Sequence, residues 1–245
     1  MRNIKLTIEY DGTNYQGWQR QKNTHRTLQE IIEKTLRKVL RQRVRLIASG
    51  RTDAAVHAQA QVANFKTNSQ LPLGKLKQAL NSLLPDDIVI TGIKAVELGF
   101  HARFSAKSKI YRYTILNQKY PSALLRNFFY FVPDKLDCKS MRQAAGLLIG
   151  RHNFRCFQAS DKKPRNSIRT IKRIGLKKQG NLIFIDIQAN GFVYKMARNI
   201  VGTLIEIGKK KQSPKNIRKI LTQKNRKFAG PTAPGYGLCL LRVKY

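Results

Sequence analysis

Carboxylates are scarce in this sequence, so each one can be examined for a structural reason to be present. The chain of 245 residues has 13 Asp and Glu against 48 Lys and Arg. Most of the acids fall where turns and helix ends commonly carry them. Asp11 precedes Gly12 directly after a strand-like run, and a turn is its ordinary explanation. Asp53 is harder to explain in this way and is the first candidate for chemistry.

Asp53 lies in the segment Ser-Gly-Arg-Thr-Asp-Ala-Ala, residues 49–55, between two strand-like runs. Its small neighbours would let a backbone or a ligand come close. The adjacent cation of Arg51 favours an ionised carboxylate, which suits a nucleophile or a base better than a general acid. From spacing alone, a hairpin turn held by the Asp side chain is at least as good an explanation. No second carboxylate for glycoside hydrolysis, no Ser-His-Asp or Cys-His set and no P-loop is evident.

Arg198 is the second candidate, because it projects from the largely apolar residues 192–207. Apolar side chains on both faces predict a helix that is buried on most sides. Arg is almost never fully buried unless it is paired, so we expect Arg198 to face a polar site and to bind a carboxylate or a phosphate. An exposed Arg on the helix of a basic protein is the alternative.

The third candidate is the segment Lys-Ile-Tyr-Arg-Tyr at residues 109–113. Alternation along a strand places Lys109, Tyr111 and Tyr113 on one face. Aromatic rings interleaved with cations suit base stacking and phosphate contact. Aromatic residues on strands are more often part of a core, so this segment is weak evidence when it is considered alone.

No metal or disulfide is expected. The three cysteines, Cys138, Cys156 and Cys239, are far apart and contain no C-x-x-C pair. The four histidines also lack the spacing of metal ligands.

The elements that must position these residues follow the order βαββαβ, and the same order recurs in the second half. In the first half we expect strands at 4–10, 44–49, 56–66 and 88–96, a helix over 28–40 that opens with a Thr27–Glu30 capping box, and a helix with Pro72 at its first position. In the second half we expect strands at 109–116, 167–177, 182–189 and 236–243, helices at 137–149 and 192–207, and a short helix after Ser213-Pro214.

A βαββαβ unit is the ferredoxin-like arrangement. The pattern therefore predicts an α+β fold of two such halves with antiparallel or mixed sheets. The boundary falls within residues 98–107, which divides the chain into 1–104 and 105–245. A cleft between two such halves would be a natural ligand site.

The formal charge of +35 favours a polyanionic partner. Nucleic acid is the partner we expect, because each phosphate that Lys or Arg neutralises also releases counterions. Codon bias that inflates Lys, or a merely well-solvated surface, is the competing explanation. We see neither a signal peptide nor a run of roughly 18 apolar residues, so we expect a cytoplasmic protein.

Six ordered segments of the chain resemble the TruA-type tRNA pseudouridine synthases, and together they run nearly from end to end. They are EYDGTNYQGWQRQ at 9–21, GRTDAAVHA at 50–58, LNSLLPDDI at 80–88, FHARFSAKSKIYRY at 100–113, MARNIVGTL at 196–204 and APGYGLCL at 233–240. The resemblance implies the α/β pseudouridine synthase fold, with two halves around a central basic cleft. The first half would carry the catalytic Asp, and the second half the active-site Tyr and Arg.

The resemblance also implies roles for individual residues. Asp53 would be the catalytic aspartate, Tyr111 the tyrosine that packs on the target base, and Arg198 the partner of the aspartate. Further contacts with the RNA substrate are expected from Arg20, Arg51, His57, Lys109 and Arg112. The implied reaction is the isomerisation of uridine to pseudouridine at positions 38, 39 and 40, in the anticodon stem and loop of tRNA. It would need no cofactor, would flip the base out of its stack, and would be carried out by a homodimer.

Three positions depart from the family pattern: Ala55 replaces the usual Gly, Ala197 the usual Val, and Lys195 lies in a variable segment. Ala55 asks for a negative φ or a small local adjustment. None of the three changes removes a functional group. Whether Asp53 attacks the ribose or abstracts a proton from it stays open, and a non-catalytic tRNA-binding protein or a general cationic RNA-binding protein is the alternative.

Overall fold

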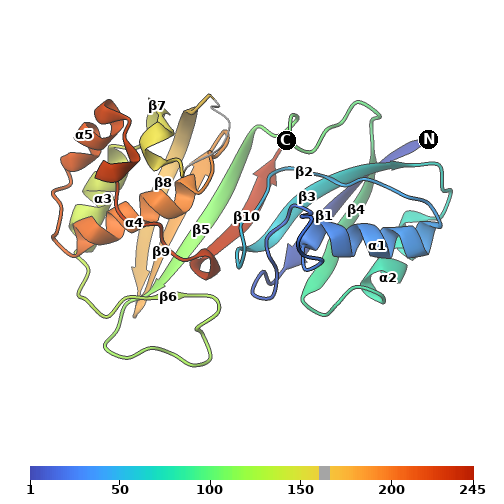
Figure 1. The fold of residues 1–245 in the computed structure, drawn as a ribbon, viewed down its shortest axis with the longest axis horizontal. Coiled ribbons are helices and arrows are strands. Elements are labelled where there is room, and N and C mark those ends of the chain that lie inside the picture. The colour runs from blue at the N-terminus through green and yellow to red at the C-terminus, as the bar shows by residue number, and fades with distance from the viewer. Residues whose placement is uncertain (160–165) are drawn as a thin grey trace. The chain divides into compact units, whose positions relative to one another are not determined.

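The computed structural model describes residues 1–159 and 166–245 (Figure 1). The chain forms two compact units. Unit 1 contains Met1–Lys107 and Cys239–Tyr245, and unit 2 contains Ser108–Leu238. The family fold class expected from the sequence, α+β with mixed strand pairing, is confirmed.

Unit 1 has the βαββαβ order that the sequence pattern predicts. Its elements are β1 (Arg2–Tyr10), α1 (Leu28–Leu40), β2 (Ile47–Ala48), β3 (His57–Thr67), α2 (Leu73–Asn81) and β4 (Ile88–Val96). Strand β1 pairs antiparallel with both β3 and β4, and β2 pairs antiparallel with β3. The resulting order β4-β1-β3-β2 is ferredoxin-like. Alternate residues of β1 form the core, and Ile4, Leu6 and Ile8 are fully buried.

The last strand, β10 (Leu238–Lys244), pairs in parallel with β3, where Cys239 is opposite His57 and Leu240 is opposite Ala58. Its end is also tied to unit 1, because Lys107 N–H donates to the Lys244 carbonyl and the Tyr245 hydroxyl donates to the Ala102 carbonyl. Residues 239–245 therefore cluster with unit 1, although their place in the repeated pattern assigns them to the second half.

Unit 2 begins with β5 (Ser108–Leu116), which pairs antiparallel with β9 (Leu182–Ala189). Strand β9 pairs with β8 (Ile168–Gln179), and β8 with β7 (Gly150–Asn153), while the short β6 (Tyr130–Phe131) runs parallel to β5. The helices are α3 (Cys138–Gly146), α4 (Met196–Gly208) and α5 (Asn216–Gln223), and α3 contacts both α4 and β8. Three short 3-10 turns complete the unit: η1 (Phe154–Phe157), η2 (Arg226–Phe228) and η3 (Gly235–Gly237).

Several predicted boundaries are wrong, each for a local reason. Strand β2 has only two residues, because only Ile47 and Ala48 find partners on β3. Helix α4 ends at Gly208, one residue beyond the predicted range of 192–207, and it begins only at Met196, because Lys195 before it has a left-handed φ of 58°. Pro72 is the residue before α2, with an extended ψ of 138°, and not the first residue of that helix.

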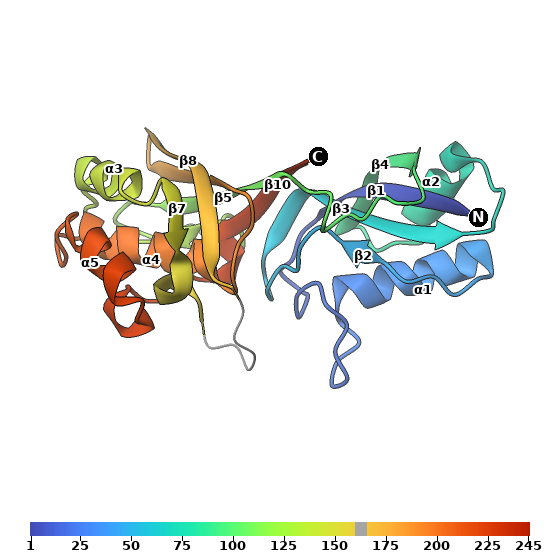
Figure 2. The same ribbon diagram turned by 90° about the horizontal axis from the view of Figure 1, so that it is seen from above.

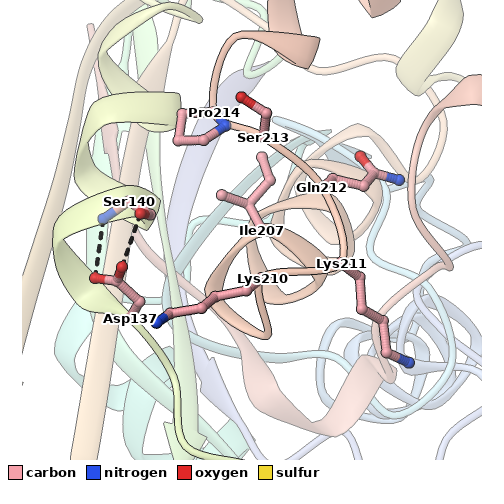
Figure 3. Close-up of a pocket in the computed structure, with 8 residues that line it drawn as sticks. All are labelled: Asp137, Ser140, Ile207, Lys210, Lys211, Gln212, Ser213 and Pro214. Carbon is pink, nitrogen blue, oxygen red and sulfur yellow. Dashed lines mark hydrogen bonds between the residues drawn. The ribbon is translucent and has the colours of Figure 1, made fainter.

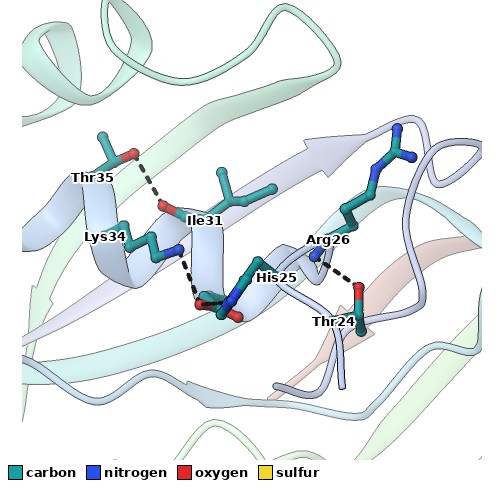
Figure 4. Close-up of polar contacts among 7 residues, drawn as sticks. Thr24, His25, Arg26, Ile31, Lys34 and Thr35 are labelled. Carbon is teal, nitrogen blue, oxygen red and sulfur yellow. Dashed lines mark hydrogen bonds and ion pairs between the residues drawn. The ribbon is translucent and has the colours of Figure 1, made fainter. Parts of the chain in front are cut away.

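The expected capping box of α1 is also wrong. Thr27 is the N-cap residue, but its side chain makes no capping hydrogen bond. The Glu30 carboxylate instead binds His25 Nδ1 at 2.8 Å and Lys34 Nζ at 3.0 Å (Figure 4). Glu30 thereby connects the helix to the end of the preceding segment. Figure 2 shows this segment, between β1 and α1, extending as a loop away from the strands of its unit.

Within the described ranges 1–159 and 166–245, no helix has the length and apolar character needed to cross a membrane. The three cysteines all lie in these ranges and are thiols.

Candidate active site

The eight site residues expected from the sequence are divided evenly between the two units. Unit 1 holds Arg20, Arg51, Asp53 and His57, and unit 2 holds Lys109, Tyr111, Arg112 and Arg198. Each unit therefore contributes its own set of groups.

Asp53 lies in the loop between β2 and β3, and both ends of this loop are tied down. Gln61 on β3 holds the beginning of the loop, since its amide oxygen accepts from the Ser49 hydroxyl at 2.7 Å and its Nε2 donates to the Gly50 carbonyl at 2.9 Å. At the centre, the buried Thr52 hydroxyl is 2.8 Å from the Tyr10 hydroxyl. The carboxylate-bearing residue is thus carried by a backbone that is fixed on either side.

The segment between β1 and α1 supports the same loop from another direction. Trp18 N–H donates to the Thr52 carbonyl at 3.0 Å, and Ala55 N–H donates to the Tyr15 carbonyl at 3.3 Å. Gly17 has a φ of +89°, and a Cβ built there would lie 2.7 Å from the Thr52 carbonyl oxygen. A side chain at Gly17 would therefore push this support away from the Asp53 loop.

The turn that contains Asp53 is closed by the backbone. Val56 N–H donates to the Asp53 carbonyl oxygen at 3.3 Å, which is a bond that any residue type at position 53 can accept. Asp53 is half-buried in this turn and stays a candidate for chemistry.

Ala55 adopts a left-handed φ of 58°. The expectation of a negative φ at this position is wrong, because the turn keeps the backbone shape that a glycine would adopt freely. A left-handed conformation costs a residue with a Cβ about 1–2 kcal/mol. The loop tolerates this cost because its neighbours hold it from both sides.

The other unit 1 candidates differ in exposure. Arg20 and Arg51 are exposed, as phosphate-binding groups need to be. His57 is buried, and its Nδ1 lies 3.0 Å from both Asp11 Oδ1 and the Gly12 amide nitrogen. The ring thus braces the turn after β1, and a contact between His57 and RNA stays a prediction.

In unit 2, β5 carries Tyr111 on a buried face, and its ring makes an edge contact with Phe192 at 4.9 Å between ring centroids. Phe192 was placed by its sequence pattern on a helix, but it precedes α4 and instead supports Tyr111. Lys109 is half-buried on the same strand. On the opposite face, Arg112 forms a two-pronged ion pair with Asp186 on β9, with N–O distances of 2.7 and 2.8 Å.

Arg198 is half-buried on the first turn of α4, and its Nε–H donates to the Ala233 carbonyl at 2.7 Å. Its own carbonyl accepts from Ala233 N–H at 3.2 Å. The guanidinium is therefore oriented by a segment 35 residues further along the chain. Sequence periodicity had no signal for this support, although Ala233 begins one of the family-like segments.

A pocket in unit 2 lies apart from all these residues. It is lined by Asp137, Ser140, Ile207, Lys210, Lys211, Gln212, Ser213 and Pro214 (Figure 3). Asp137 there is the N-cap of α3 and accepts hydrogen bonds from the amide nitrogens of Lys139 and Ser140. The hydrogen bond with the Ser140 hydroxyl and the amide of Ser140 lower the pKa of Asp137. This arrangement is explained by helix capping.

Comparison with known proteins gives consistent matches. A family model described as tRNA pseudouridine synthase matches residues 6–105 and 144–245. The tRNA pseudouridine synthase A of Acetivibrio thermocellus is 48% identical over 245 residues, which cover 100% of both chains. The tRNA pseudouridine synthase A of a Thermoanaerobacter species is 48% identical and the tRNA pseudouridine synthase A 2 of Clostridium perfringens 47% identical, again over 100% of both chains.

The matched segments of the family model contain Arg20, Arg51, Asp53, His57 and Arg198. The other three candidates lie between those segments, in a region that the full-length relatives cover.

Proposed function

Because the chain belongs to the tRNA pseudouridine synthase family, and is accordingly an isomerase that makes pseudouridine in tRNA, we propose that its targets are the uridines at positions 38, 39 and 40. These positions lie in the anticodon stem and loop. The observation that carries the assignment of the chemistry is the Asp53 loop, whose backbone is fixed from both sides.

In this proposal Asp53 acts on the ribose of the target uridine, either at the sugar carbon that holds the base or by removing a sugar proton. The bond from the sugar to N1 of uracil breaks, the base turns, and a new bond forms from the sugar to C5. The C5 hydrogen leaves as a proton and N1 gains a proton, so the product is an isomer of uridine and the reaction involves no net redox change. The base must leave its stack first, at a cost of roughly a few kcal/mol, which phosphate contacts offset.

Unit 2 supplies the groups that receive the base and hold the charge. Tyr111 presents an aromatic ring that Phe192 keeps in place, and this ring would stack on the flipped uracil. The Arg198 guanidinium would bind the Asp53 carboxylate and stabilise its negative charge. Arg20, Arg51, Lys109, Arg112 and His57 would contact the RNA around the target.

The homodimer and the cytoplasmic location belong to the same proposal. A net charge of +35 makes two copies repel one another at low salt, so a dimer would need contacts that overcome this repulsion. Sedimentation at physiological salt would report twice the mass of one chain without tRNA, and two chains plus the bound RNA with tRNA. A single-chain mass under both conditions would contradict the dimer.

The decisive experiment replaces Asp53 by Asn and follows release of tritium from C5-labelled uridine in tRNA. We expect turnover to fall by about 10⁴-fold or more, while tRNA affinity changes only a few-fold because no cation is lost. Asp86→Asn, which removes a carboxylate from an exposed position of the same unit, is the matched control and should keep full activity. Normal tritium release by the Asp53 variant would overturn the assignment and favour a non-catalytic tRNA-binding protein.

The position of the new pseudouridine tests the substrate. Chemical mapping of tRNA from cells that lack this chain should show loss of modification in the anticodon arm alone. Loss in the T-loop would mean that the enzyme has a different target within tRNA.

A further inference from the structure

One irregular segment of unit 2, residues 229–234, lies along the first turns of α4. Two hydrogen bonds join Ala233 to Arg198: Ala233 N–H donates to the Arg198 carbonyl, and Arg198 Nε–H donates to the Ala233 carbonyl. Five residues further along α4, the buried Thr203 hydroxyl accepts from Gly230 N–H at 2.9 Å and donates to the Asn199 carbonyl at 2.8 Å. The segment is therefore held at both ends against the helix that carries Arg198.

The Asn199 side chain is the centre of this attachment. It is fully buried, and its Nδ2 donates to the Phe157 carbonyl at 2.8 Å. Its Oδ1 accepts from the Thr232 hydroxyl at 2.6 Å and from Arg226 Nη2 at 3.2 Å. A buried amide left without these partners would cost about 1–3 kcal/mol, so the segment and the helix favour one relative arrangement.

Arg226 adds further hydrogen bonds to this network. Its Nη1 donates to the Ala229 carbonyl at 3.0 Å, and its Nη2 reaches the Thr232 hydroxyl at 3.3 Å as well as Asn199. Burial lowers the pKa of Arg226. The guanidinium, the amide and the hydroxyl thus form one connected set of hydrogen bonds.

There is also no space for the segment to shift towards the helix. A Cβ built on Gly202 of α4 would lie 1.7 Å from the Pro231 carbonyl oxygen. The glycine at this position lets the segment approach the helix backbone directly. A small displacement would break the short contact between Ala233 and the Arg198 side chain.

The far end of the same segment reaches strand β5. The Pro234 carbonyl accepts from the Tyr113 hydroxyl at 2.9 Å. Burial raises the pKa of Tyr113 well above its ordinary value, which keeps it a neutral donor, while the nearby Arg198 acts in the opposite direction. Tyr113 lies two residues after Tyr111 on the same face of β5. Residues 229–234 therefore connect β5, which carries the proposed base-stacking Tyr111, with α4, which carries Arg198.

We propose that Asn199, Thr232 and Arg226 are positioning residues for the reaction. They hold residues 229–234 against α4, so that the Ala233 carbonyl stays hydrogen-bonded to the Arg198 Nε–H and orients the guanidinium. The inference rests on the proposed role of Arg198 in the function above. A displacement of a catalytic group by about 1 Å can cost up to about 100-fold in rate. Loss of one hydrogen bond in the network should therefore lower turnover without removing a group that touches the RNA.

The first test compares Thr232→Val with Thr232→Ser. Valine keeps the shape but removes the hydroxyl that Asn199 binds, and we expect kcat to fall roughly tenfold with KM for tRNA within about twofold. Serine restores the hydroxyl and should restore kcat. Thr222→Val is the matched control, because it removes an exposed hydroxyl that bonds only within α5, to the Arg218 carbonyl. Arg226→Met tests the same network through a different residue.

The second test observes the Arg198 Nε–H directly by ¹H–¹⁵N NMR, with Arg198→Lys used to assign its signal. In the wild type the hydrogen bond to Ala233 should slow exchange of this proton with water. Thr232→Val and Arg226→Met should speed exchange several-fold, whereas Thr222→Val should not. This readout does not depend on catalysis.

The two measurements together separate the possible failures. Faster exchange with a lower kcat and a preserved KM supports the inference. Unchanged exchange in folded Thr232→Val and Arg226→Met overturns it, whatever the activity. Faster exchange with unchanged kcat also overturns it. In that case the role proposed for Arg198 is wrong, and the kinetics of Arg198→Lys would show this independently.

Discussion

At the scale of single residues, the distinction that matters is between a side chain that supports the backbone and one that is left for chemistry. Asp137 caps α3 with its carboxylate, and His57 braces the turn after β1. At Asp53 the backbone closes the turn instead. The backbone on either side of Asp53 is held by other segments, and the proposed reaction gives its carboxylate a chemical role.

Arg198 provides a prediction at this scale. Arg198→Ala should lower kcat by about 100-fold, as expected for loss of one preorganised donor at a reacting centre, while KM for tRNA changes less than about threefold. Steady-state tritium release over a range of tRNA concentrations measures both values. Equal losses in binding and turnover would instead identify Arg198 as a phosphate contact.

At the scale of elements, the loops around the proposed site are held by bonds to distant segments. The Asp53 loop is fixed by β1, by β3 and by the segment between β1 and α1. The first turn of α4 is fixed by residues 229–234. Such support limits the motion of the residues that each element carries.

Ala55 gives a prediction about the stability of the Asp53 loop. Because Ala55 has a φ of 58°, Ala55→Gly relieves left-handed strain but increases the freedom of the unfolded chain. The net effect should be a gain of about 0.5–1 kcal/mol in the free energy of unfolding. Urea denaturation measures it, with Ala54→Gly as the neighbouring control, where no such gain is expected because Ala54 lacks a positive φ. A loss of stability in Ala55→Gly would show that the strain is smaller than the entropy cost.

Glu30 gives a prediction about pH. Hydrogen bonds from His25 and Lys34 hold the pKa of the Glu30 carboxyl below its ordinary value of 4.5. The folded state thus binds the proton less well than the unfolded state, so this carboxylate stabilises the fold above about pH 4.5 and the contribution is lost as the pH falls through the lower, folded pKa. Thermal unfolding of Glu30→Gln should show a lowered Tm at pH 7 and a smaller difference from the wild type at pH 3. Glu9→Gln, on an exposed position of β1, should show little difference at either pH.

At the scale of the whole molecule, the excess of 48 cationic over 13 anionic residues dominates its behaviour. Several cations form ion pairs with acids of the same chain, as Arg112 does with Asp186 and Lys209 with Asp134. With so few acids, most of the cations have no acidic side chain to pair with. This balance suits binding of a polyanion by many phosphate contacts.

The salt dependence of tRNA binding follows from this charge. If about six phosphates are neutralised, raising monovalent salt from about 50 to 200 mM should weaken affinity on the order of 10³-fold. At saturating tRNA, kcat should change little, because the enzyme is then fully bound and salt acts mainly on the binding step. Filter binding and single-turnover rates at each salt concentration measure the two effects. An affinity that is insensitive to salt would contradict recognition through the phosphate backbone.

Features that depend on neighbouring residues can be predicted from the sequence. The period-2 pattern of β1 and β9 and the apolar faces of α1 and α4 locate these elements, because periodicity is a local property. The family-like segments predict the reaction, and the segment at 50–58 predicts Asp53 as its catalytic residue. These inferences needed no knowledge of which segments meet.

Contacts between residues far apart in the sequence are visible only in the folded structure. The parallel pairing of β10 with β3, the connection of Glu30 to His25 and not to Thr27, and the contact of Asn199 with Thr232 are of this kind. A polar side chain has many potential partners in a sequence. In the folded protein a buried polar group without a hydrogen bond costs free energy, so the arrangement that provides one is favoured. For that reason the proposed catalytic residues are evident from the sequence, whereas the groups that aim them are not.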